Sequence, residues 1–179
     1  VSAFLLNRSS DLAMLYVSDA KYVAWEDQNA VVDGVASNII LTDGKEGNDF
    51  YCPRSFTAEK ITYTHNYTME TGIMEPRGWE TIALPYDVQT IKHATAGVIL
   101  PFKKWTTESE EKPFWLYELT ASGYQEAEGI KANTPYIISM PNNSLYLTDY
   151  RLIGKVTFES ENVEVKNSRD LNSARYSDR

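Results

Sequence analysis

Aromatic side chains are the residues of this sequence whose types and spacing best suit ligand binding. Trp105 lies at the edge of the charged segment 103–112, and Trp115 and Tyr117 stand two residues apart in an apolar segment. Residues two apart on a strand point to the same face, so Trp115 and Tyr117 are expected side by side. Aromatic rings have apolar faces that suit stacking against sugar rings. Trp105, Trp115 and Tyr117 are therefore the candidate binding residues, with packing in the core as the alternative for each.

Groups suited to nucleophilic or metal chemistry are scarce. The sequence has two histidines, His65 and His93, and one cysteine, Cys52, too few for a Cys/His zinc site built from sequence neighbours. Both histidines are expected to pack, and Cys52 is expected to be a small buried hydrophobic residue. The acidic segment 43–49 departs from the spacing of a calcium loop. We therefore predict no catalytic residue, no metal site and no cofactor.

Carboxylates leave one catalytic alternative open. Glu80 and Asp87 flank an apolar segment, and Glu118 lies inside another. A glycoside hydrolase needs two carboxyl groups at a fixed separation across a cleft, which a sequence does not reveal. Nucleophile-elbow and phosphate-loop motifs are absent from the sequence. The sequence therefore favours a protein that is not an enzyme, with a carbohydrate-active hydrolase as an alternative.

Charge and hydropathy restrict the partners. The 179 residues carry a formal net charge of −8, whereas nucleic acids and anionic membranes attract basic surfaces. No apolar run is long enough for a transmembrane helix, so no membrane insertion is expected. Residues 1–6 show no signal-peptide features, and residues 166–179 read as a polar tail or a linker to a further region. The chain is expected to be a monomer.

The element expected to position these side chains is the stretch 78–88, Gly-Trp-Glu-Thr-Ile-Ala-Leu-Pro-Tyr-Asp-Val. Large apolar groups alternate on both of its sides, which predicts a core strand covered on both faces and ending near Pro85. Trp79 is expected in the core. Residues 56–67 show the clearest alternation in the chain, and Asp33-Gly34 marks a turn between two apolar segments.

Short apolar segments with frequent turn signals predict an all-β fold, a sandwich-like arrangement of antiparallel sheets with little or no helix. Residues 1–165 are expected to form a single β-rich domain. Two small β subdomains meeting near residues 70–78 remain an alternative.

Four parts of the chain resemble one family: residues 29–36 with 41–44, residues 51–53 with 56–58, the stretch 78–88 and residues 131–138. The family comprises the β-rich domains of exported and surface proteins of the leucine-rich-repeat type in Bacteroides-like bacteria. The resemblance implies an extracellular, cell-surface or periplasmic location and a role in adhesion or ligand binding. It supplies no catalytic residues, and this sequence contains no leucine-rich repeat.

Together these observations predict a non-catalytic β-sandwich module that binds a glycan or a surface protein within a larger exported protein. A structural spacer without a ligand of its own is the alternative of a different class.

Overall fold

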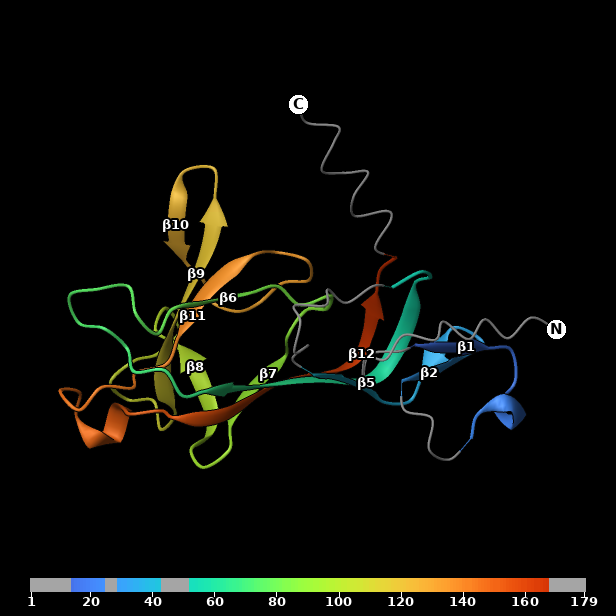
Figure 1. Cartoon of the computed structure of the whole chain (residues 1–179), viewed down its shortest axis with the longest axis horizontal. Helices are drawn as coiled ribbons and strands as arrows, with labels where there is room; N and C mark the ends of the chain where they lie inside the picture. Colours follow the sequence, from blue (N-terminus) through green and yellow to red (C-terminus); the bar gives the residue numbers. More distant parts are fainter. Residues whose placement is uncertain (1–13, 25–28, 43–51, 168–179) are drawn as a thin grey trace. The chain divides into compact units, whose positions relative to one another are not determined.

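The computed structural model describes residues 14–24, 29–42 and 52–167 (Figure 1). Its regular structure is almost entirely β, and its helices are two short 3₁₀ turns, η1 (Ala20–Tyr22) and η2 (Thr148–Tyr150). The predicted all-β class with little helix is confirmed. No helix among the described residues is long and apolar enough to cross a membrane.

The strands of the first half of the chain are β1 (Leu15–Val17), β2 (Ala30–Val32), β3 (Val35–Ala36), β4 (Ile39–Thr42), β5 (Phe56–Tyr67), β6 (Glu80–Ile82) and β7 (Thr90–His93). The second half supplies β8 (Gly97–Pro101), β9 (Lys112–Thr120), β10 (Gly123–Glu126), β11 (Tyr136–Ser139) and β12 (Gly154–Val165).

The strands form a mixed hydrogen-bonded sheet in the order β1-β2-β3-β5-β12-β7-β8-β9-β11-β6, with β4 paired to β5 and β10 paired to β9. Most pairs are antiparallel, as expected. The pairs β1–β2, β3–β5 and β8–β9 are parallel. Parallel neighbours need longer connections than hairpins, and such connections leave no signature in a local hydropathy pattern.

Two compact units divide the chain. The first comprises residues 1–63 and 160–179, and the second comprises residues 64–159. The division falls inside two long strands, β5 and β12.

The first unit contains the predicted Asp-Gly turn. Asp33 and Gly34 both have positive φ, 48° and 81°, and they connect β2 to β3 as expected for a tight hairpin. Cys52 is fully buried and forms no disulfide, which confirms its assignment as a small core residue. The predicted strand over residues 56–67 is β5, with the same bounds.

The second unit corrects the prediction for the stretch 78–88. Only Glu80–Ile82 forms a strand, although Leu84 and Tyr86 are buried as predicted. Beyond β6 the backbone pairs with a loop instead of a strand, since Leu84 accepts from the Asn133 amide and the Val88 amide donates to Ile130. The strand therefore ends at Ile82 and does not extend to Pro85. Pro85 is the expected end of the strand because it has no N–H to donate to a neighbouring strand.

Candidate functional site

The predicted binding residues Trp115 and Tyr117 lie on one face of β9, as their spacing required. Burial alternates along the strand: Phe114 and Leu116 are fully buried, whereas Trp115 and Tyr117 are partly exposed. Leu119, the next residue on their face, is 50% exposed. β9 therefore has a core face and an outer face, and the two candidate aromatic residues belong to the outer face.

Trp79, which directly precedes β6, also lies on this outer face. β11 lies between β6 and β9, with Ser139 opposite Trp115 and Ile138 opposite both Leu116 and Glu80. Trp79 precedes Glu80, and its ring centroid lies 6.0 Å from that of Trp115 and 5.8 Å from that of Tyr117. The small Ser139 side chain is buried and donates to the Gly78 carbonyl at 2.7 Å. Trp79 is therefore a partly exposed member of the outer face and not the core residue expected.

Trp105 reaches the same face from the loop after β8. The Trp105 amide bonds to the carbonyls of Pro101 and Phe102, which closes a turn. Its indole Nε1–H donates to the Glu111 carbonyl at 3.0 Å. The Phe102 ring lies 6.0 Å from Trp105 and 5.3 Å from Trp115, so it connects the two candidate tryptophans.

The loop between β11 and β12 adds two more rings. Tyr146 lies 5.6 Å from Trp115, and Tyr150 lies 5.8 Å from Trp105 in an edge-to-face contact. The Leu152 amide donates to the Pro141 carbonyl and closes the base of this loop. We call the resulting set the aromatic strip: Trp79, Phe102, Trp105, Trp115, Tyr117, Tyr146 and Tyr150.

Every member of the aromatic strip is partly exposed, and none is fully buried. The fully buried large side chains of this unit, such as Tyr86, Tyr136 and Phe114, are separate residues. Contiguous exposed apolar surface on a folded domain marks an interaction site more often than scattered single residues do. The strip is thus a surface feature supported by the core and not part of it.

A polar hollow of about 320 Å³ lies at the Trp105 end of the strip. Trp105 and Tyr150 supply its aromatic wall, and its charged residues are Glu110, Glu111, Lys112 and Asp149. The Lys112 ammonium group lies 3.4 Å from the Arg151 carbonyl. We call this feature the acidic hollow, since three carboxylates outnumber one ammonium group.

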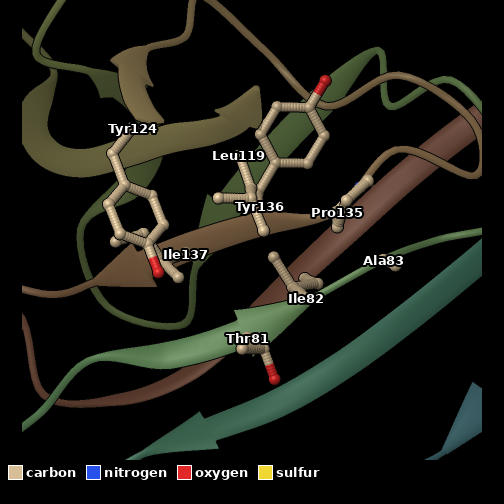
Figure 2. A pocket seen from close by; sticks show the side chains of 8 residues that line it. All are labelled: Thr81, Ile82, Ala83, Leu119, Tyr124, Pro135, Tyr136 and Ile137. Atoms are coloured by element: carbon tan, nitrogen blue, oxygen red, sulfur yellow. The ribbon is translucent and has the colours of Figure 1, made fainter. Parts of the chain in front are cut away.

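An apolar groove of about 170 Å³ lies at the Tyr117 end. Figure 2 shows Tyr124 of β10 with its ring turned toward Ile137 of β11, and Thr81 of β6 lower in the view. Leu119 also lines the groove and stands opposite Tyr124 in the β9–β10 register.

The Tyr117 hydroxyl has a defined electrostatic setting. It donates to Glu126 Oε1 at 3.5 Å, and Glu126 is its cross-strand partner on β10. Burial, followed by the nearby Glu126 carboxylate, raises the pKa of Tyr117. The hydroxyl therefore keeps its proton in the hydrogen bond to Glu126, and its oxygen can still accept a hydrogen bond from a ligand.

The carboxylates considered for hydrolysis have structural partners. Glu80 Oε2 lies 2.7 Å from His65 Nε2. Asp87 accepts from the Ala132 amide at 2.8 Å and from the Lys131 ammonium group at 3.1 Å. Glu118 stands opposite Tyr136 of β11 in the strand register. The contacts of Glu80 and Asp87 give those two carboxylates a role in packing or loop closure, and the assignment of the protein as not an enzyme stays a prediction.

The histidines also make specific contacts. The His65 ring lies 4.5 Å from Tyr67 in an edge-to-face arrangement. His93 is 5% exposed; its Nδ1 accepts from the Thr95 and Ala96 amides, and its Nε2 lies 3.0 Å from the Ile153 carbonyl. His93 therefore closes the turn between β7 and β8. Among the described residues, no three His, Cys, Asp or Glu side chains gather into a possible metal site; the acidic segment 43–49 lies outside those residues.

The structure brings all three predicted binding residues into one strip, and it adds four that the sequence does not predict there. Trp79 was assigned to the core because both faces of its segment looked apolar. Phe102, Tyr146 and Tyr150 come from connections whose positions depend on tertiary structure. Their only local signal is an aromatic residue in a polar loop.

Comparison with known proteins gives no match to this chain among family models, curated protein sequences or solved structures. The resemblance to surface-protein domains of Bacteroides-like bacteria therefore stays a prediction.

Proposed function

We propose that this protein is a non-catalytic carbohydrate-binding module and that the aromatic strip is its glycan-binding surface. The observation that carries the proposal is the continuity of the strip, in which partly exposed rings contact one another at centroid distances of 5.3 to 6.0 Å. A row of aromatic faces offers apolar surface at little conformational cost, because each side chain has few rotatable bonds.

Polar groups beside the strip supply what sugar recognition also needs. The carboxylates of the acidic hollow and the Tyr117–Glu126 pair offer acceptors for hydroxyl groups, and the Lys112 ammonium group of the hollow offers a donor. Rings that contact the apolar face of a sugar, together with polar groups that bond its hydroxyls, form a complementary pair of interactions. Such a module would act in an exported or surface protein, where polysaccharides are met.

The test is binding of soluble neutral polysaccharides by affinity electrophoresis and of a glycan array by the purified protein. The variant Trp105→Ala should weaken binding at least about tenfold, or ~1.4 kcal/mol, while the protein stays folded. Tyr22→Ala is the matched control, since Tyr22 is 49% exposed in the other unit and lies outside the strip. Failure of every glycan to bind would reject the proposal and favour a spacer or a module that binds a protein.

A further inference from the structure

The two hollows and the aromatic strip lie on one continuous surface along β9. The acidic hollow includes Lys112 and Pro113 at the beginning of β9, and the apolar groove includes Leu119 near its end. Trp115 and Tyr117 lie between them on the outer face. Six residue steps separate Pro113 from Leu119, which at about 3.3 Å per residue amounts to ~20 Å.

Strand register places part of the lining of the apolar groove next to the strip. Ile137 stands opposite Tyr117 on one side and opposite Thr81 on the other, and both Ile137 and Thr81 line the groove. Directly opposed residues in antiparallel strands point to the same face. Ile137 and Thr81 therefore connect the outer face at Tyr117 to the groove.

The far end of the groove is also aromatic. Tyr124 on β10 is 58% exposed and stands opposite Leu119. Tyr124 belongs to the β9–β10 hairpin, and Figure 2 shows its ring beside Ile137 in the groove. Aromatic surface is thus available at both ends, from Tyr150 and Trp105 to Tyr124.

We propose that this surface binds an extended, uncharged oligosaccharide of several residues rather than a single terminal sugar. The proposal rests on the proposed function and adds the length and chemical class of its ligand. A monosaccharide would cover a single ring or pair of rings, whereas the ~20 Å surface offers consecutive contacts to a chain. The carboxylates of the acidic hollow disfavour a polyanionic chain by like-charge repulsion.

Because the apolar groove adjoins the aromatic strip, the same oligosaccharide should occupy both. A chain seated on Trp105, Trp115 and Tyr117 continues over Leu119 and Tyr124, because β9 runs without a break between them. The remote contact at Tyr124 should then matter only for ligands long enough to reach it.

The experiment is isothermal titration calorimetry with cello-, manno- and xylo-oligosaccharides, each as a series from the monosaccharide to the hexasaccharide. We expect affinity in the series that binds to rise about tenfold or more between the disaccharide and the hexasaccharide, since each added sugar residue gains a further aromatic contact. Tyr124→Ala should weaken hexasaccharide binding about three- to tenfold and leave disaccharide binding unchanged. Trp105→Ala should weaken binding of both.

The Tyr22→Ala variant is the control for loss of an exposed tyrosine, and circular dichroism with thermal melting checks that each variant is folded. Equal affinity for the monosaccharide and the hexasaccharide would overturn the extended-ligand proposal and leave glycan binding standing. Unchanged hexasaccharide binding by Tyr124→Ala would overturn it as well. Absence of binding by any saccharide would overturn both this proposal and the proposed function.

Discussion

The indole Nε1–H of Trp105 donates to the backbone carbonyl of Glu111 at 3.0 Å, so this side chain spans the loop that connects β8 to β9. One edge of the ring is therefore used to fix the loop, and the same ring walls the acidic hollow. Loop geometry and ligand surface depend on a single residue, and two substitutions can separate them.

Trp105→Phe keeps an aromatic ring and removes the hydrogen bond to Glu111. We expect the free energy of unfolding to fall by about 1 kcal/mol, because a carbonyl loses its partner. Glycan affinity should fall less than in Trp105→Ala, since a ring remains for stacking. Urea denaturation and calorimetric titration of both variants measure the two effects. Equal loss of affinity in the two variants would contradict a stacking role for this ring.

Gly78→Ala should destabilise the fold at the base of the aromatic strip. Gly78 has φ +77°, and an added Cβ would lie 2.8 Å from the Thr71 Cα. The left-handed conformation costs a residue other than glycine ~1–2 kcal/mol, and the backbone clash adds to this. We expect a total loss of about 2 kcal/mol or more in urea denaturation.

Gly97→Ala is the matched control, because Gly97 has φ +74° with no atom within 4 Å of an added Cβ. Its loss should be limited to the conformational cost. If the two variants were equally destabilised, close backbone packing around Gly78 would have no measurable role.

Cys52 should be protected from thiol reagents in the folded protein. Its side chain is fully buried, its Sγ donates to the Arg54 carbonyl at 3.0 Å, and burial raises the pKa of the Cys52 thiol. Since the thiolate is the reactive form, iodoacetamide at pH 8 should modify Cys52 only slowly until a denaturant is added. Mass spectrometry over time measures this, and fast labelling without denaturant would contradict the buried assignment.

The same residues predict alkaline destabilisation. Burial raises the pKa values of both Cys52 and its neighbour Tyr16, whose hydroxyl lies 3.6 Å from the sulfur. The unfolded chain therefore releases these protons first, and stability that is present below about pH 9 is lost as the pH rises further. Cys52→Ala should show a shallower loss of melting temperature between pH 8.5 and pH 10 than the unchanged protein, because the thiol no longer contributes. Identical pH profiles would exclude a contribution from this thiol.

The acidic hollow should discriminate against charged glycans. Glu110, Glu111 and Asp149 face the same space as a single ammonium group, that of Lys112. We expect polygalacturonate to bind more weakly than a neutral polysaccharide at low salt, and the difference to shrink at high salt because ions screen exposed charges. The double variant Glu110→Gln with Asp149→Asn should reduce the discrimination. Affinity electrophoresis at two ionic strengths measures it, and a preference for the uronate would contradict the charge argument.

Local patterns were sufficient to predict the parts of the fold that local chemistry determines. The alternation in residues 56–67 predicted β5 to the residue, and Asp33-Gly34 predicted the hairpin turn, because side-chain period and positive φ are properties of short segments. The apolar pattern of residues 154–165 does not predict the single long strand β12, because polar Glu159, Glu161 and Asn162 interrupt it. Pairing to neighbouring strands keeps these residues extended, and pairing is a long-range effect.

The candidate site was predicted in part for the same reason. Trp115 and Tyr117 share a face by spacing alone, and Trp105 stood out as an aromatic residue in a charged loop. Trp79 was misplaced because the apolar alternation of its segment does not reveal which face is covered by other chain segments. Its contact with Trp115 depends on β11 lying between β6 and β9, an order that no local pattern specifies.

On β9, each outer ring has a core residue as its neighbour in sequence: Phe114 precedes Trp115, and Leu116 separates Trp115 from Tyr117. A molecule that immobilises the outer rings would therefore also hold the backbone that anchors the core. By mass action, any such ligand would raise the melting temperature by an amount that grows with its concentration. A thermal-shift screen that follows intrinsic tryptophan fluorescence would thus identify an unknown ligand by the increase in melting temperature that it causes.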